Sequence, residues 1–281
     1  MKASVIVTTY NRPDALTAVL KGLAAQVDQD FEVLVADDGS TQDTAQLVQT
    51  MAADFPVSLR HVWQEDQGFR AGAARNRACA HATGDYWIFL DGDCVPLPDF
   101  VSEHKRLAQA GCFVAGNRVL LSDTFTREAL SRQLPLHARR PGRWLWDRLQ
   151  GRINRWMPLL HAADGAWRLR APTRWQGART CNLAVWREDF VSVNGFDEAY
   201  AGWGHEDADL AVRLIRQGVR RKDGRFATAV LHLWHRENDR SHLEENVQRL
   251  EQIIAGDRIQ AQLGLSQYPC TGRSTCSSPP P

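Results

Sequence analysis

Apolar and polar positions in the first hundred residues alternate between two kinds of segment. The short apolar, β-branched runs that indicate strands cover residues 3–9, 31–35, 57–63 and 86–90. Helices are expected between these runs. The first follows Pro13, which suits a first helical turn, and its helical spacing is carried by Leu16, Val19, Leu20 and Leu23. Strands that alternate with helices at short spacing predict βαβ units, and therefore an α/β fold with a mostly parallel sheet.

The pattern continues less regularly in the rest of the chain. Further helices are expected over residues 43–53, 99–110, 187–193 and 243–254, with others beginning near Arg70 and at Glu206. Further strands are expected over residues 113–121, 182–186 and 226–233. Residues 127–179 show no clear period. The elements indicate one α/β domain over residues 1–264, followed by a disordered tail over 265–281 that has little material for a core.

Acidic residues follow two of the predicted strands directly. Asp37 and Asp38 come after the second strand, and Asp91 and Asp93 flank a glycine after the fourth. Because the carboxyl ends of parallel strands meet at one edge of a sheet, these carboxylates are expected to lie close together. Their repulsion must be offset, most simply by a divalent cation and by hydrogen-bond donors from a ligand. Taken alone, Asp-Gly-Asp could equally be a turn.

A segment rich in glycine, alanine and arginine lies between the two acidic pairs. Residues 67–77 contain Gly68, Arg70, Gly72 and Arg75 and begin a helix whose amino end can face an anion. This is not the dinucleotide-binding pattern, whose glycines should follow the first strand. An alanine-rich helix start with solvated arginines explains the segment nearly as well.

Two later segments add candidate chemistry. Trp203 stands between two glycines, which predicts an exposed turn, and the acids Glu206 and Asp207 then open a helix. Acids in a first turn are common capping residues, but an exposed tryptophan beside them is harder to explain as capping. His232 lies at the end of the last predicted strand, and His235 comes just after it. On a regular strand they would face opposite sides, so both can reach one ion only if the strand ends and bends there.

Composition excludes some classes of protein. The 34 lysines and arginines nearly cancel the 33 acidic residues, so global charge does not indicate a nucleic-acid-binding protein. No apolar run approaches the roughly 20 residues that cross a bilayer, and the chain leads from Met1 straight into a strand pattern. A cytoplasmic protein is therefore expected. The six cysteines show no Cys-x-x-Cys spacing and are interpreted as buried or incidental thiols.

Charge is distributed less evenly within residues 127–179. This stretch holds twelve arginines, no lysine and three acids, interleaved with five tryptophans. Arginine with tryptophan suits an anionic, partly apolar surface such as phospholipid headgroups or a lipid-linked saccharide. Peripheral contact with the inner membrane is therefore one hypothesis. An irregular, solvated insertion is the other.

Taken together, these motifs resemble a known family. Val-Ile-Val-Thr-Thr-Tyr-Asn-Arg, Ala-Asp-Asp-Gly-Ser, Gly-Ala-Ala-Arg-Asn and Asp-Gly-Asp, in this order, resemble a family 2 glycosyltransferase with the GT-A fold. Gly-Trp-Gly-His-Glu-Asp-Ala-Asp-Leu followed by His-Leu-Trp-His resembles the β-1,4-galactosyltransferases and the chondroitin-type polymerases. The resemblance covers about residues 1–240. It implies a nucleotide-sugar-binding half over 1–100, an acceptor and catalytic half over 101–240, and a carboxyl-terminal helix.

The resemblance implies a set of donor-binding residues. Asp37 is similar to the acid that recognises uracil, with Tyr10 and Arg12 near the base, and Arg75 to the arginine on the nucleotide side. Asp91 is expected near the ribose or the sugar. Others implied to contact the donor are Thr9, Asp38, Arg70, Asp93 and Trp203.

The resemblance also implies the metal and the catalytic groups. Asp93 and His235 would bind Mn²⁺ or Mg²⁺, and His232 stands where the family can place a methionine ligand. Asp207 matches the proposed catalytic base, and Glu206, Asp207 and Trp203 would contact the acceptor. His205 stands where galactosyltransferases usually have glycine, so donor specificity cannot be carried over.

The function implied is an inverting transfer of a hexose or N-acetylhexosamine from a UDP-sugar. The acceptor would be a saccharide or a lipid-linked saccharide, in lipopolysaccharide or cell-surface polysaccharide synthesis. A sugar-phosphate nucleotidyltransferase is a weaker alternative, because residues 8–12 lack the glycine-rich loop it usually carries. A non-catalytic sugar-nucleotide or glycan-binding module is another alternative. Intact Asp91, Asp93, Asp207 and His235 argue against it, since folding alone does not need them.

Overall fold

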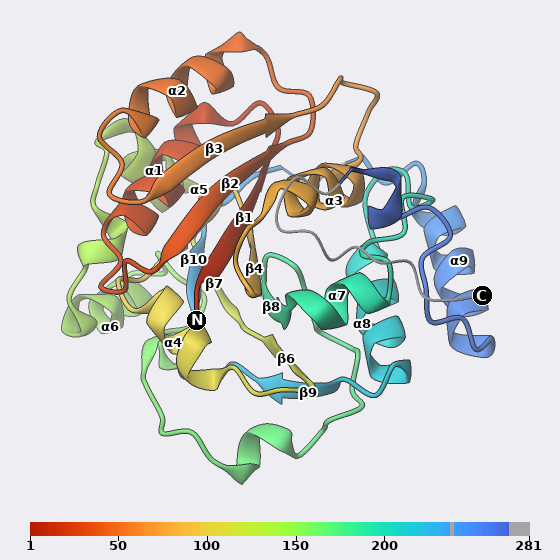
Figure 1. Cartoon of the computed structure of the whole chain (residues 1–281). Helices are drawn as coiled ribbons and strands as arrows, with labels where there is room; N and C mark the ends of the chain where they lie inside the picture. The colour runs from red at the N-terminus through yellow and green to blue at the C-terminus, as the bar shows by residue number, and fades with distance from the viewer. Residues whose placement is uncertain (237–238, 270–281) are drawn as a thin grey trace.

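The computed structural model describes residues 1–236 and 239–269, which form an α/β fold around a seven-stranded, mostly parallel sheet (Figure 1). The strand order is β3-β2-β1-β4-β8-β6-β9. The bounds of these strands are Ala3–Thr9 (β1), Phe31–Asp37 (β2), Ser58–Trp63 (β3), Tyr86–Asp91 (β4), Cys112–Ala115 (β6), Asn182–Trp186 (β8) and Arg220–Asp223 (β9). A small second sheet has the order β5-β10-β7, formed by Cys94–Pro96, Val230–His232 and Arg118–Leu120.

Helices cover both faces of the large sheet (Figure 1). Their bounds are Pro13–Ala24 (α1), Gln42–Ala52 (α2), Ala71–His81 (α3), Phe100–Leu107 (α4), Asp123–Ser131 (α5), Pro141–Leu149 (α6), Arg187–Ser192 (α7), Glu206–Arg216 (α8) and Leu243–Ala255 (α9). Short 3-10 helices span Leu136–Ala138, Met157–Leu159, Ala166–Leu169 and Leu265–Gln267. None of the helices in the described ranges is long and apolar enough to cross a membrane.

Alternation along the strands divides the core into two layers. Val5 and Val7 of β1 pack with α1, whereas Ile6 between them packs with α3 on the opposite face. This is the period of two that a strand requires, and it explains why β1 and β4 are buried on both sides. The two apolar layers hold the sheet rigid, so the residues at its edges are placed accurately.

The register of the parallel strands places both acidic pairs at one edge of the sheet, as the sequence predicted, with β1 between them. Thr9 of β1 pairs with Asp37 of β2, and Thr8 pairs with Asp91 of β4. Asp37 and Asp91 therefore flank the carboxyl end of β1 at one edge of the sheet. Asp93 directly precedes β5. In the small sheet, β10 pairs with β5 and places His232 opposite Cys94.

Several predicted boundaries were wrong. The strand predicted over residues 113–121 is two strands, β6 and β7, separated by Gly116 and Asn117. A Cβ atom at Gly116 would lie 2.2 Å from Oδ1 of Asn182, so the chain can pass here only with glycine. The strand predicted over residues 226–233 is reduced to β10, and β9 was missed. β9 reads Arg-Arg-Lys-Asp, which carries no apolar alternation.

The stretch of residues 127–179 is more ordered than a solvated insertion. It contains the end of α5, all of α6 and three of the 3-10 helices, and Trp144 is buried in the main core. The predicted disordered tail began too early, because Leu265 is buried and the hydroxyl of Tyr268 donates to Glu198 over 3.0 Å. Residues 270–281 of that prediction lie outside the described residues.

Candidate active site

Arg75 is the central cation of the acidic edge. Its position at the buried face of α3 brings the guanidinium to within 2.9 Å of Oδ1 of Asp91 and 3.3 Å of Oε1 of Glu206. Its Nε donates to Thr8 over 2.8 Å. One buried arginine thus connects the ends of β1 and β4 with the start of α8, although Glu206 is 131 positions away in the sequence.

Burial perturbs the protonation of this cluster. Removal from water raises the pKa of Asp91 to about 6 and that of Glu206 to about 7, and neighbouring carboxylates add to both shifts. Burial alone would lower the pKa of Arg75, but Asp91, Asp207 and Glu206 raise it above its ordinary value. Titratable groups displaced in this way are typical of functional sites, because a fold without a ligand gains nothing from crowding them.

Asp93 lies between the two histidines of the carboxyl-terminal half. Nε2 of His235 is 3.3 Å from Oδ2 of Asp93, and Nε2 of His232 is 3.7 Å from Oδ1. The strand β10 ends at His232, as the two-histidine hypothesis required, and the ring centroids are 5.2 Å apart. The structure therefore brings together the three residues that were predicted to bind metal.

The tautomer of His235 suits a metal ligand. Its Nδ1 lies 2.6 Å from the carbonyl oxygen of Arg236, and a carbonyl can only accept a hydrogen bond. Nδ1 therefore carries a proton, so in the neutral form of the ring the lone pair is on Nε2, which faces Asp93. His232 is held neutral, since burial lowers its pKa to about 4.

The donor atoms fit a divalent cation. Cis ligands of an octahedral Mg²⁺-sized ion lie about 3 Å apart, because each is about 2.1 Å from the metal. The contact between Asp93 and His235 is close to this spacing. Cys94 also offers a ligand atom within 4.8 Å of those of Asp93 and His232. Burial raises the pKa of its thiol well above the ordinary value, and carboxylate and imidazole suit Mn²⁺ or Mg²⁺ better than a protonated thiol does.

A second acidic site lies at the end of β2. Asp37 is fully buried, accepts from the backbone N–H of Ser40 over 2.8 Å, and has Nε2 of His61 at 2.7 Å. Asp38 accepts from Gln64 over 2.7 Å and from the backbone of Arg70 over 2.6 Å. Burial raises the pKa of Asp38 to about 6. These contacts fix both carboxylates in place.

The other predicted donor residues surround this edge with varied contacts. Thr9 ends β1 with a buried hydroxyl that has no partner in the described structure. The exposed ring of Tyr10 donates its hydroxyl to Asp66 over 2.9 Å. The side chain of Arg12 pairs instead with Asp14 at the start of α1, 2.9 Å away. Its predicted contact with the base therefore needs a different side-chain position.

The turn before α8 places the remaining predicted residues. Gly202, Gly204 and His205 all have positive φ, which explains the sharp exposed turn around Trp203. The turn delivers Glu206 and Asp207 to the first turn of α8. Oδ1 of Asp207 accepts a hydrogen bond from the hydroxyl of Thr180.

Sequence reasoning missed His61, Gln64 and Thr180, which hold Asp37, Asp38 and Asp207 respectively. None of the three belongs to a local motif. Their partners follow from tertiary structure, since β3 lies beside β2 and the segment before β8 lies beside α8. Only the sheet order could have indicated His61.

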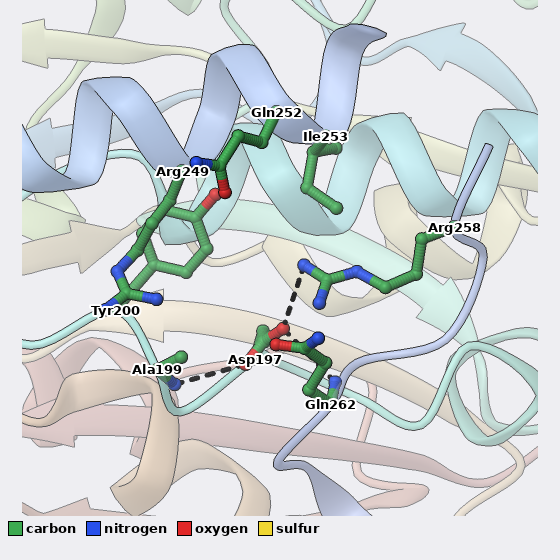
Figure 2. A pocket seen from close by; sticks show the side chains of 8 residues that line it. All are labelled: Asp197, Ala199, Tyr200, Arg249, Gln252, Ile253, Arg258 and Gln262. Carbon is green, nitrogen blue, oxygen red and sulfur yellow. Dashed lines mark hydrogen bonds and ion pairs between the residues drawn. The ribbon is translucent and has the colours of Figure 1, made fainter. Parts of the chain in front are cut away.

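A separate cavity of about 220 Å³ lies between α9 and the loop that follows β8 and α7. Figure 2 shows Arg258 paired with Asp197 on one side and Tyr200 and Arg249 on the other. None of the predicted site residues lines it, so it is distinct from the acidic edge.

Comparison with known proteins agrees with this fold. The model described as glycosyl transferase family 2 matches residues 4–171, more than half of the chain. A second model, described as the N-terminal domain of galactosyltransferase, matches residues 161–236. The chain belongs to glycosyl transferase family 2. The predicted resemblance is confirmed in both halves.

Two curated relatives illustrate the range of similar proteins. Validoxylamine A glucosyltransferase of Streptomyces hygroscopicus subsp. jinggangensis is 32% identical over 230 residues, which are 77% of this chain and 52% of the relative. Hyaluronan synthase of Pasteurella multocida is 29% identical over 236 residues, 76% of this chain and 23% of the relative. The chain thus spans about half, or less, of the length of these relatives.

Solved structures confirm the predicted GT-A type of α/β fold. The mannosyltransferase PcManGT from Pyrobaculum calidifontis, in complex with GDP-Man and Mn²⁺, has a TM-score of 0.59 at 22% identity, covering 90% of this chain and 63% of that one. S. aureus TarS 1-349 in complex with UDP has a TM-score of 0.60 at 18% identity, covering 95% and 68%.

Proposed function

We propose that this chain transfers a hexose or an N-acetylhexosamine from a UDP-sugar to a saccharide, with inversion at the anomeric carbon. The observation that carries the proposal is the convergence of Asp93, His235 and His232 beside the cluster that Asp91 and Glu206 form with the buried Arg75. Residues from both halves of the sequence meet there, and folding alone does not explain their charges. Relatives that include a glucosyltransferase and polysaccharide synthases support this class of reaction.

The donor would occupy the edge formed by β1, β2 and β4. Asp37, held by His61 and Ser40, would accept hydrogen bonds from the uracil ring, and Tyr10 would stack near it. Arg75 would hold Asp91 in place beside the ribose or the sugar. Solved structures of similar fold in complex with GDP-Man, UDP and UDP-GlcNAc support a nucleotide-sugar as the donor.

Asp93 and His235, with His232 beside them, would hold Mn²⁺ or Mg²⁺. The cation would act as a Lewis acid on the diphosphate leaving group. Asp207 would accept the proton of the acceptor hydroxyl as its oxygen attacks the anomeric carbon. The hydroxyl of Thr180 donates to Asp207 and thereby holds its carboxylate in position. Glu206 and Trp203 would position the sugars.

The acceptor would be a saccharide, free or linked to lipid, in cell-surface polysaccharide or lipopolysaccharide synthesis. Hyaluronan and chondroitin synthases among the relatives support a polysaccharide context. The arginine- and tryptophan-rich stretch supports a peripheral contact of the protein with a membrane that carries such an acceptor.

The test is a panel of UDP-sugars incubated with the purified protein and Mn²⁺, scored by release of UDP. We expect hydrolysis of one or two donors that stops with EDTA and is absent in Asp93→Ala. Asp43→Asn, a change of an exposed acid in α2, is the matched control. Release of pyrophosphate from UTP and a sugar phosphate would instead indicate a nucleotidyltransferase. Donor binding with no turnover of any donor or acceptor would indicate a binding module.

A further inference from the structure

Helix α6 carries an apolar face that points to solvent. Leu145 is 43% exposed, Trp146 51% and Leu149 71%. Successive residues of an α-helix are about 100° apart around its axis. These three side chains therefore lie within one sector of about 100° on the surface of α6. We call them the α6 face. Large apolar side chains grouped in this way are unusual on a protein surface unless they contact a partner.

The opposite side of α6 is fixed to the protein. Trp144 is buried in the main core, and Asp147 is fully buried and accepts two hydrogen bonds from Arg139 over 2.6 and 2.7 Å. Arg139 also lies 5.0 Å from the ring of Phe125 in α5. The inner face of α6 therefore holds the helix in place. The α6 face can contact a partner without any rearrangement of the helix.

Arginines border the α6 face. Arg140, Arg143 and Arg148 are exposed, and neither Arg140 nor Arg148 forms an ion pair within the described part of the chain. On the helix, Arg148 lies on one side of the apolar group and Arg143 on the other. The only carboxylate in residues 139–149 is the buried Asp147, so the exposed charges of this segment are all positive.

We propose that the α6 face docks on an anionic phospholipid bilayer. Leucine and tryptophan side chains would enter the boundary between headgroups and acyl chains, and the bordering arginines would lie among the phosphates. The charge complementarity favours this occupant over a second copy of the chain, whose own α6 face would be equally positive. This inference rests on the proposed function, because it supplies the surface on which a lipid-linked acceptor would be presented.

The α6 face is connected to the candidate active site through one helix. Arg139, which holds Asp147, stacks on Phe125 of α5, and the next residue of α5, Thr126, accepts from the backbone N–H of Trp234 over 2.9 Å. Trp234 precedes the candidate metal ligand His235. Docking through α6 would therefore hold the site in a set orientation to the membrane.

The test is flotation of the full chain with vesicles of phosphatidylcholine alone and of phosphatidylcholine with phosphatidylglycerol. We expect binding to the anionic vesicles that falls about tenfold or more between low and high salt. Trp146→Ser with Leu149→Ser should lower binding by at least about tenfold. The matched control is Val27→Ser with Leu263→Ser, which changes side chains that are 70% and 51% exposed elsewhere. Arg143→Gln with Arg148→Gln should reduce the salt dependence.

Binding that is equal for both vesicle types, or unchanged in the α6 variant, would overturn the proposal. A dimer in light scattering that the α6 variant abolishes would also overturn it, in favour of contact between two copies. Hydrolysis of a water-soluble UDP-sugar without vesicles is measured in parallel and should be the same in every variant. If the α6 variant loses vesicle binding and keeps hydrolysis, the two proposals stand independently. If the parent protein binds vesicles but hydrolyses no donor, only the proposed function fails.

Discussion

Nε2 of His235 lies 3.3 Å from Oδ2 of Asp93, although the two residues are 142 positions apart in the chain (235 − 93). The backbone carbonyl of Arg236 accepts from the other ring nitrogen, so in the neutral ring the lone pair faces the carboxylate. Two ligand atoms placed in this way, close to the spacing of cis ligands, support the proposed cation site.

We therefore expect His235→Ala to weaken Mn²⁺-dependent binding of UDP by at least about tenfold to a hundredfold, a range known for perturbed metal sites. Calorimetry of UDP binding with and without Mn²⁺ measures this effect. His137→Ala, a histidine of the 3-10 helix Leu136–Ala138, is the control and should bind as the parent does. If the affinity of the parent protein for UDP does not depend on Mn²⁺, the assignment of His235 and Asp93 as metal ligands is wrong.

Asp207→Asn should lower the rate of transfer by about 10² to 10⁴, the range for a general base, and should leave UDP binding unchanged. Thr180→Val removes the hydroxyl that donates to Asp207, so we expect a smaller loss of about tenfold in kcat. Both rates are compared with that of Asp43→Asn. Transfer by Asp207→Asn at the parent rate would contradict its assignment as the base.

Glu206 makes stability depend on pH. Burial raises its folded pKa to about 7 from an ordinary value of 4.5, so the folded state keeps a proton that the unfolded state has lost. The free energy of unfolding should therefore fall as the pH rises from 4.5 to 7. Glu206→Gln removes the free-energy cost of burying an ionised carboxylate. Without divalent cations, this variant should stabilise the fold by about 1 to 3 kcal/mol at pH 8.

Urea denaturation with EDTA at pH 5 and pH 8 measures the effect of Glu206→Gln. The gain at pH 8 should be clearly larger than the gain at pH 5. A gain that is the same at both pH values would mean that Glu206 is not the group responsible. Activity should fall in the same variant, since stabilising a strained site commonly weakens its function.

The ion pair between Arg213 and Asp209 anchors α8. Both side chains are fully buried, and Arg213 donates to Asp209 over 2.6 and 2.8 Å and to the carbonyl of Val193 over 2.7 Å. Arg213→Ala leaves a buried carboxylate without its partner, so we expect a loss of about 3 to 5 kcal/mol in the free energy of unfolding. Arg216→Ala, further along the helix and partly exposed, should cost much less. Equal effects would contradict the role of burial.

The sequence was sufficient to predict the convergence of the acids, because two local facts determine it. Each acidic pair follows an apolar run directly, and parallel strands end at a common edge. The end of β10 at His232 meets the condition that the sequence set for two histidines to share one ion. These inferences depended on residues adjacent in the chain and on the geometry of a strand.

Contacts that depend on packing between distant elements could not be predicted. His61 reaches Asp37 because β3 lies beside β2, and Thr180 reaches Asp207 because the segment before β8 passes α8. The same holds for β9, whose four polar residues are a strand only because they pair with β6. The family resemblance supplied roles for Asp207 and His235 that residue patterns alone did not.

The ion pair between Arg75 and Glu206 has a consequence for how such chains diversify. It is made by α3 and α8, and none of its atoms belongs to the stretch between residues 127 and 179. Closing a longer or shorter loop costs little extra entropy. Insertions or deletions at the exposed turns of that stretch, away from buried anchors such as Trp144 and Asp147, can therefore accumulate while Arg75 and Glu206 still meet.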